Sequence, residues 1–319
     1  MKKLWHIREL STVAILVAEI LFFSWYLWPD GNRTHPFLSA ENFLLILKYS
    51  SIYGIAAVGA AVVIISGGID LAPGSVIALA SVVCAYLFVQ AEWALAPSLL
   101  CALLVGIAAG ALSSALIVVV KLPPFIATLG VMGITRGIAF IITEGRYFDV
   151  SSKLVGGWRP LGLPSDWVAP LVMIGLAIVF QLLMTRFQWG RQIFSIGGNE
   201  TAALFSGVAV GRIKLTVYLL SGLLAAVAGV VLALVQGQGK ADLATGYELD
   251  IIASAVVGGA SLSGGRGSVM GAVLGTLIFG VLRNALPQIP GATFYDRLIV
   301  GLAVIVIVVM DQLLLKRGE

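Results

Sequence analysis

The sequence predicts an all-α integral membrane protein with about ten transmembrane helices, and three observations lead to this fold class. Of the 319 residues, 59% are hydrophobic and only 11% are charged, whereas about 25% of the residues of a typical soluble protein are charged. Apolar stretches of about 20 residues, the length that a helix needs to cross a bilayer, recur along the whole chain. Glycine, proline and charged residues separate these stretches. The pattern leaves almost nothing for a soluble domain.

The apolar stretches and the breakers between them place the crossings in order. They are expected near residues 10–28, 43–66, 72–90, 96–120, 123–143, 168–184, 214–235, 249–263, 268–287 and 294–314. The first is expected to be a retained helix, because no small-residue cleavage site precedes Pro29. Segment 249–263 is the shortest and is rich in small residues. It counts as a crossing because this choice agrees best with the charges of the loops.

Basic residues decide the orientation. With the N-terminus inside, the cytoplasmic ends hold Lys2, Lys3, Arg8, Lys121, Arg186, Arg191, Arg212, Lys214, Arg266, Lys316 and Arg317, and the outside holds Arg33, Arg146, Lys153, Arg159, Lys240 and Arg297. This excess follows the positive-inside rule and predicts that both termini are cytoplasmic. The basic residues form no cluster, so nucleic acid is not an expected partner. Two longer loops, 144–167 outside and 186–213 inside, are expected to be docking surfaces.

The sequence indicates neither a cofactor nor a metal. Cys84 and Cys101 lie in apolar spans, and His6 and His35 are far apart, so no disulfide framework or metal site is expected. The chain contains no G-x-x-x-x-G-K-[ST] motif. Any ATP hydrolysis must therefore come from a partner.

One glycine-rich stretch interrupts two aliphatic runs between Val62 and Val83. Gly67 and Gly68 can end the first helix, Asp70 can accept the amide of Ala72, and Pro73 suits the first turn of the next helix. The stretch is therefore expected to form a tight helical hairpin at the cytoplasmic end. A purely structural turn and a part in gating are both open interpretations.

A second copy of the pattern lies between Ala255 and Gly275. It again has aliphatic residues, Gly-Gly, a short linker, Gly-Ser-Val and a new apolar helix, which predicts an internal repeat of a glycine-rich hairpin. The gating candidates from both copies are Gly67, Gly68, Asp70, Gly74, Ser75, Gly258, Gly259, Gly264, Gly265 and Gly267. Asp70 and Arg266 could form a charge pair between the copies, or each could be solvated.

The inside loop contains a short amphipathic helix in "NETAALFSGV". Asn199 is expected to cap it, with Ala203, Leu204 and Val208 on one apolar face. Gly190, Gly197 and Gly198 would let the backbone turn sharply into and out of this helix. A helix lying on lipid is the alternative to a helix that docks a partner.

Polar residues inside spans are costly and tend to be functional. The candidates for a translocation path are Thr128, Arg136, Asp250 and Asn284, whereas Glu19 is expected to pair with Lys48 for packing. Three glycine pairs have the spacing that allows close helix packing. They are Gly106 and Gly110, Gly133 and Gly137, and Gly271 and Gly275.

Four stretches together resemble one known family. They are "ISGGIDLAPGSVIALASVV", "KLPPFIATLGVMGITRGIAF", "GRQIFSIGGNETAALFSGVAVGRIKLTVYLLSGLLAAVAG" and "ELDIIASAVVGGASLSGGRGSVMGAVLGTLIFGVLRNAL". In this order they resemble the permease subunit of bacterial ribose-type ABC importers, a group that includes permeases for ribose, xylose, rhamnose and autoinducer-2. The likeness covers roughly residues 40–315. Ala72 and Pro73 depart from the family's usual Ser-Val, which stiffens the turn.

The resemblance implies a single permease domain over residues 1–319 in the bacterial inner membrane, in contact with membrane lipid. It implies three protein partners: an ABC ATPase subunit inside, a periplasmic sugar-binding protein outside, and a second permease in a homodimer or heterodimer. The short helix resembles the family's coupling helix. The coupling candidates are Gly190, Arg191, Gly197, Gly198, Asn199, Ala203, Leu204 and Gly207.

Three other functions remain open at this point. An ion-gradient-driven secondary transporter would need acids deep in the bundle, for which Glu19, Asp70 and Asp250 are the candidates. A non-transporting receptor or scaffold would use the inside loop to dock a signalling protein. Within ABC importers, a permease for a nucleoside or a branched-chain amino acid is the nearest rival to a sugar permease.

Overall fold

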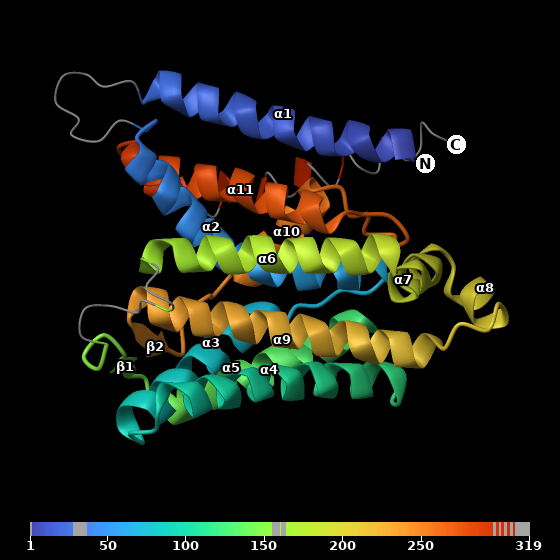
Figure 1. The fold of residues 1–319 in the computed structure, drawn as a ribbon, viewed down its shortest axis with the longest axis horizontal. Coiled ribbons are helices and arrows are strands. Elements are labelled where there is room, and N and C mark those ends of the chain that lie inside the picture. The colour runs from blue at the N-terminus through green and yellow to red at the C-terminus, as the bar shows by residue number, and fades with distance from the viewer. Residues whose placement is uncertain are drawn as a thin grey trace.

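The structure is a computed structural model that describes residues 2–27, 37–154, 160, 164–295, 298–299, 301–302, 305–306 and 309. Its long helices lie side by side in one bundle (Figure 1), which confirms the predicted helical class. In chain order the helices and strands are α1 (Lys2–Tyr26), α2 (Ala40–Ile65), α3 (Pro73–Ala85), the π-helical turn η1 (Tyr86–Gln90), α4 (Leu95–Val118), α5 (Pro124–Thr143), β1 (Tyr147–Asp149), α6 (Ser165–Arg186), α7 (Gln188–Gly198), α8 (Glu200–Phe205), α9 (Val210–Gln236), β2 (Gln238–Lys240), α10 (Tyr247–Val257), α11 (Val269–Ala285), η3 (Leu286–Gln288) and η4 (Ala292–Tyr295).

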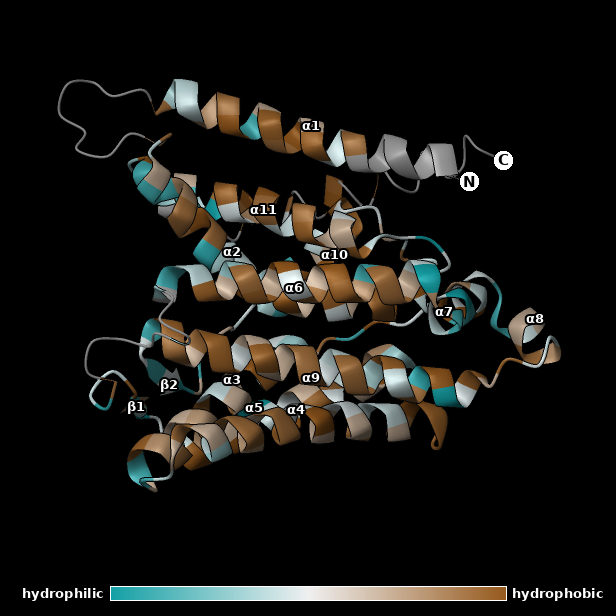
Figure 2. Ribbon diagram, viewed as in Figure 1, coloured by the Kyte–Doolittle hydropathy of each residue, from teal (hydrophilic) through white to brown (hydrophobic). Residues whose placement is uncertain are grey.

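Seven of the described helices are long and apolar enough to cross a membrane. They are α2, α3 with η1, α4, α5, α6, α9, and α11 with η3, and the apolar part of α1, Leu10–Tyr26, is shorter. Figure 2 shows hydrophobic residues along the whole length of the long helices and hydrophilic residues mainly near their ends. Each of the seven lies within a few residues of a predicted span. Most of the predicted crossing at 294–314 lies outside the described residues.

The predicted crossing at 249–263 is wrong as a complete helix. Helix α10 has only 11 residues, so at 1.5 Å per residue it is about 17 Å long, against about 30 Å of hydrocarbon. The chain reaches it from β2 through the non-helical residues 241–246. A helix broken in this way is tolerated in a membrane where the irregular backbone is enclosed by protein.

Helices α2 and α9 form the centre of the bundle. Every residue of α2 from Ser50 to Ile65 is buried, and most of α9 from Ser221 to Leu234 is buried as well. The outer helices α4, α5 and α6 leave large apolar side chains exposed, among them Leu104, Ile141 and Ile178. These exposed apolar faces suit lipid rather than water.

Two of the three predicted glycine pairs lie at close helix contacts. A Cβ on Gly110 would lie 2.9 Å from the Cα of Leu219 in α9, and one on Gly275 would lie 2.9 Å from the carbonyl carbon of Ser254 in α10. Gly133 and Gly137 differ, because an added Cβ there would meet nothing within 4 Å. Both glycines lie on an exposed face of α5.

The two ends of the bundle carry different small elements (Figure 1). At one end, the α8 end, α7 and α8 project beyond the long helices. At the other, the β end, β1 pairs antiparallel with β2 in the register Tyr147 to Lys240 and Asp149 to Gln238. This pairing ties the loop after α5 to the segment that leads into α10.

Candidate functional site

The first glycine-rich turn, residues 66–72, ends α2 and then runs back into the bundle. Gly67 has φ +81°, and the amides of Gly67 and Gly68 donate to the carbonyls of Ile64 and Val63, as in a glycine-terminated helix. Pro73 begins α3. These parts of the sequence prediction are confirmed.

Asp70 lies deeper than the predicted tight hairpin would place it. Its carboxylate accepts the amide of Ala72 at 2.9 Å, as predicted, and the hydroxyl of Ser221 at 2.7 Å. Asp70 is only 6% exposed, and Ser221 lies about three turns into α9. Of the two open interpretations of Asp70, solvation does not hold in the structure, because the residues before Pro73 are non-helical and carry the chain inward.

The start of α3 is correspondingly enclosed by other helices. Ser75 donates to the carbonyl of Ala72, and the hydroxyl of Thr135 in α5 lies 2.6 Å from that of Ser75. A Cβ on Gly74 would lie 2.8 Å from the carbonyl oxygen of Ala244 and would overlap Glu248 Oε2. The N-termini of α3 and α10 therefore meet inside the bundle.

The second glycine-rich turn, residues 258–268, joins α10 to α11. Gly259, Gly264, Gly265 and Gly267 have φ values of +94°, +79°, +70° and +153°, which favour glycine. Gly258 packs against Gly271. The hydroxyl of Ser268 accepts the amide of Gly271 and so caps α11.

The two turns touch, but not through the predicted charge pair. The amide of Gly265 donates to the carbonyl of Ile65 at 2.9 Å. Asp70 is bonded to Ser221, whereas Arg266 is exposed. Main-chain contacts, rather than an Asp70–Arg266 ion pair, hold the turns together.

The segment α7–α8 is a compact elbow outside the long helices. Gly190 packs against the backbone of Met184, and the Arg191 guanidinium donates to the carbonyl of Arg186 at 3.3 Å. Asn199 accepts the amide of Ala202 at 2.9 Å and caps α8 as predicted. Gly207, with φ +83°, turns the chain out of the helix.

The apolar face predicted for α8 is wrong. Ala203 is 2% exposed and faces the protein, whereas Leu204 is 58% and Phe205 86% exposed. Phe205 was not among the predicted residues. A six-residue helix is too short for its periodicity to indicate which side faces the bundle. The exposed pair Leu204 and Phe205 forms an apolar tip, and the ion pair of Lys214 with Glu200, at 2.7 Å, braces the helix against α9.

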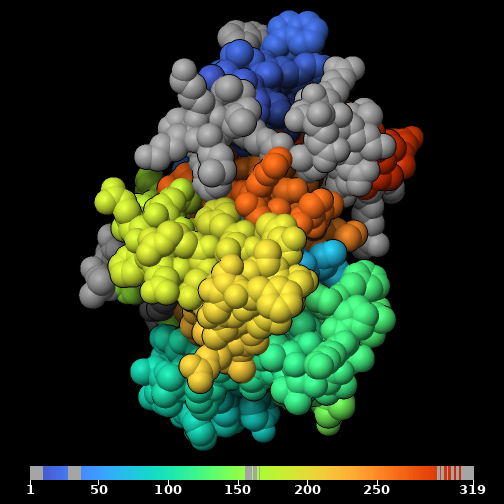
Figure 3. All heavy atoms as spheres, turned by 90° about the vertical axis from the view of Figure 1, so that its right-hand side faces the viewer, coloured from blue at the N-terminus to red at the C-terminus, as the bar shows by residue number. Residues whose placement is uncertain are grey.

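Gly197 brings the elbow against both turns. A Cβ on Gly197 would overlap the carbonyl oxygen of Ile65 and the amide nitrogen of Gly265, and one on Gly264 would lie 2.7 Å from the carbonyl oxygen of Gly197. Figure 3 looks onto this end, where the yellow segment around residue 200 lies beside the orange segment that precedes α11. The end of α7 at the predicted coupling residue Gly197 therefore lies against both turns that contain predicted gating residues.

The predicted translocation residues are spread along the bundle. The Arg136 guanidinium donates to the carbonyls of Ala241 and Leu243 at 2.6 and 2.7 Å, and Thr128 donates to the carbonyl of Pro124 within its own helix. Asn284 donates to Asn42 at 2.9 Å, near the start of α2. Arg136 therefore holds the segment before α10, whereas Asn284 joins α11 to α2.

Asp250 forms an ion pair with Arg283, a residue that was not among the predicted translocation residues. Arg283 pairs with its carboxylate at 2.6 Å, and the guanidinium lies 5.8 Å from the ring centre of Tyr53. The ring of Tyr53 in turn lies 4.4 Å from that of Tyr247. Of the residues in this cluster, the sequence indicated only Asp250 as a candidate.

The predicted pair of Glu19 and Lys48 does not form. Lys48 pairs with Asp166 at 2.6 Å. Glu19 Oε2 is buried without a hydrogen-bond partner. Sequence alone could not show that the start of α6, rather than α1, lies beside Lys48.

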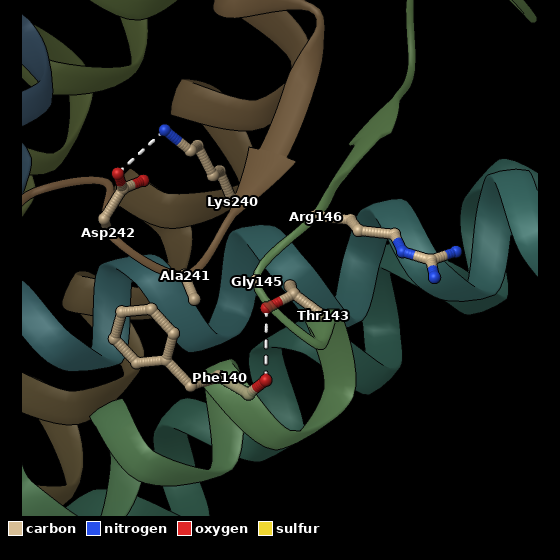
Figure 4. Close-up of a pocket in the computed structure, with 7 residues that line it drawn as sticks. All are labelled: Phe140, Thr143, Gly145, Arg146, Lys240, Ala241 and Asp242. Carbon is tan, nitrogen blue, oxygen red and sulfur yellow. Dashed lines mark hydrogen bonds and ion pairs between the residues drawn. The ribbon is translucent and has the colours of Figure 1, made fainter.

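The β end has a small pocket with both polar and apolar lining residues. Its lining residues are Phe140, Thr143, Gly145, Arg146, Lys240, Ala241 and Asp242, and Lys240 pairs with Asp242 at 2.7 Å (Figure 4). Nearby, the hydroxyl of Ser151 donates to the Asp149 carboxylate, and this hydrogen bond lowers the pKa of Asp149. Arg146 follows α5 and Lys240 ends β2, so basic residues from two segments lie beside the acidic Asp242.

Among the described residues, no group of three or more His, Cys, Asp or Glu side chains could hold a metal ion.

Comparison with known proteins places the chain in a family. The family model described as "Branched-chain amino acid transport system / permease component" matches residues 42–309. The chain belongs to this family of permeases. As a family member, it is a multi-pass membrane transport subunit and not an enzyme.

Several curated relatives match over nearly the whole chain. The ribose import permease protein RbsC of Escherichia coli K12 is 35% identical over 318 residues, which cover 97% of this chain and 95% of the relative. The xylose transport system permease protein XylH of the same strain is 32% identical and covers 96% of this chain and 92% of the relative. RbsC of Bacillus subtilis is 36% identical over 86% of each chain. No solved structure matches the chain.

Proposed function

We propose that this chain is the membrane permease of an ATP-driven ABC importer for a small sugar of the ribose or xylose type. The observation that carries the proposal is the similarity to ribose and xylose permeases, which extends over nearly the full length of this chain and of each relative. A branched-chain amino acid is the second candidate substrate, because the matching family model carries that description. An ATPase subunit and a sugar-binding protein are the partners that such a permease requires.

The orientation follows from the basic residues at the two ends. The α8 end carries Lys121, Arg186, Arg191, Arg212, Lys214 and Arg266, and the β end carries Arg146, Lys153 and Lys240. The positive-inside rule then assigns the α8 end to the cytoplasm, and the N-terminus of α1 lies at the same end (Figure 1). With ten crossings, including the broken one through α10, the C-terminus is cytoplasmic as well.

The cytoplasmic ATPase docks on α7–α8, with Leu204 and Phe205 as the inserted tip. The support is the exposure of two adjacent large apolar side chains on a short helix whose other side is anchored by Ala203. Interface energy is concentrated in a few such residues. Gly190, Arg191, Gly197, Gly198, Asn199 and Gly207 shape the elbow that presents them.

Two permeases form the complete pathway, as a homodimer or as a heterodimer with a sister permease. The exposed α5 face with Gly133 and Gly137 supports this, because small residues at this spacing allow close helix packing and none of the described residues lies within 4 Å of a Cβ at either position. The glycine-rich turns 66–72 and 258–268, which we interpret as copies of an internal repeat, form the inner gate. Arg136 and Asp250 lie along the path, Thr128 beside the first turn, and Asn284 nearer the outer end.

The sugar-binding protein docks at the β end, over the loop 144–167 and β2.

Uptake by proteoliposomes that contain the permease, its ATPase and its binding protein tests the function. Labelled ribose or xylose should accumulate only when ATP is supplied on the ATPase side. Accumulation of leucine in place of sugar would favour the second candidate, and accumulation driven by a proton or sodium gradient without ATP would contradict the proposal.

A further inference from the structure

Three backbone segments meet at Gly197 with no side chain between them. A Cβ on Gly264 would lie 2.7 Å from the carbonyl oxygen of Gly197 and 2.9 Å from the Cα of Gly67. A Cβ on Gly265 would lie 2.8 Å from the Cα of Gly198. Close-packed backbones transmit displacement, because no rotamer change can absorb it. The end of α7 and the two turns are therefore in rigid contact.

A hydrogen bond makes the two turns one unit. The amide of Gly265 donates to the carbonyl of Ile65 at 2.9 Å. Gly197 packs against this hydrogen bond, because a Cβ on Gly197 would overlap both the carbonyl oxygen of Ile65 and the amide nitrogen of Gly265. Gly264 and Gly265 have φ values of +79° and +70°, a conformation that strains any other residue. Positions 264 and 265 therefore require glycine.

The docking helix α8 is connected to the first turn on both of its sides. Before α8, only Asn199 separates Gly198 from the helix start. After α8, helix α9 holds the same turn through the hydrogen bond from Ser221 to Asp70 at 2.7 Å. A displacement of α8 must therefore reach the turn through α7, α9 or both.

We propose that Gly197 is a positioning residue through which α8 and the two glycine-rich turns move together, so that ATPase docking at α8 opens and closes the inner gate. The inference rests on the proposed function. It deepens that function by naming the contact that carries the movement.

A matched pair of variants tests the proposal. Gly197→Ala places a Cβ against Ile65 and Gly265, whereas Gly175→Ala adds the same atom in α6, the helix before α7, with nothing within 4 Å. Both are reconstituted with the ATPase and the sugar-binding protein. Sugar uptake, ATP hydrolysis and the amount of bound ATPase are measured on each preparation.

The amount of ATPase bound by Gly197→Ala should be within about twofold of the wild-type amount. The ratio of sugar transported to ATP hydrolysed should fall by at least about tenfold. Gly175→Ala should keep the wild-type ratio. A merely structural defect would lower the amount of complex but not this ratio. Equal ratios for the two variants would overturn the inference and leave the proposed function intact, whereas ATP-independent uptake by the wild type would overturn the proposed function.

A measurement on the wild-type complex decides the matter even if Gly197→Ala fails to assemble. Hydrogen exchange is followed in peptides that cover residues 64–72, 197–207 and 258–268, with and without a non-hydrolysable ATP analogue. Exchange should change in both turns together whenever it changes in α8. A change confined to residues 197–207 would contradict the coupling through Gly197.

Discussion

Truncation of Phe205 tests the docking surface most quantitatively. Phe205 is 86% exposed at the end of α8, so Phe205→Ala should change the free energy of unfolding of the permease by no more than about 0.5 kcal/mol. Burial of a phenylalanine side chain in an interface contributes about 1.5–3 kcal/mol. Its loss should therefore weaken ATPase binding by about 10-fold to 150-fold, at about 1.4 kcal/mol for each factor of ten.

The assay is the affinity of the purified ATPase for the permease in detergent, measured by biolayer interferometry. Phe125→Ala is the control, because Phe125 has an exposed ring, at 51%, on another helix, α5. The control should bind the ATPase with wild-type affinity. Wild-type affinity for Phe205→Ala, within twofold, would refute the assignment of α8 as the docking helix.

Three further predictions concern the same mechanism. Leu204→Asp places a charge in the proposed apolar contact and should abolish sugar uptake while the protein remains in the membrane at normal amount; full uptake would remove Leu204 from the interface. Asp70→Asn keeps the shape and one acceptor oxygen, so the free energy of unfolding should fall by only about 1 kcal/mol, while uptake falls at least about tenfold because an amide nitrogen replaces the second acceptor oxygen at the gate; unaltered uptake would leave Asp70 as a helix-start residue only. Cysteines at Ser152 and Ser206 should be labelled by a membrane-impermeant maleimide from opposite faces; labelling of both from one face would overturn the assigned orientation.

The course of the chain was predictable where hydrophobicity alone decides it. The long helices α2, α4 and α9 match the predicted spans 43–66, 96–120 and 214–235 to within a few residues, because an uninterrupted apolar stretch has one stable form in a bilayer. Local hydrogen bonds were predictable as well. Asn199 caps α8 and Asp70 accepts the amide of Ala72, since both bonds depend only on residues two or three positions away.

Contacts between distant segments were not predictable. Lys48 pairs with Asp166 rather than Glu19, because hydropathy gives the order of helices along the chain but not their neighbours in the bundle. The depth of Asp70 depends on Ser221, which is 151 positions away. The exposed tip at Phe205 was missed because the orientation of a six-residue helix is set by α7 and α9, not by its own pattern.

Isolation of the chain from its native membrane in mild detergent, with mass spectrometric identification of its partners, tests the central claim most directly. The account predicts that an ABC ATPase and a sugar-binding protein are recovered with it, and that Leu204→Asp loses the ATPase but not the binding protein. Recovery of the intact permease with neither partner would contradict the account and favour a transporter driven by an ion gradient.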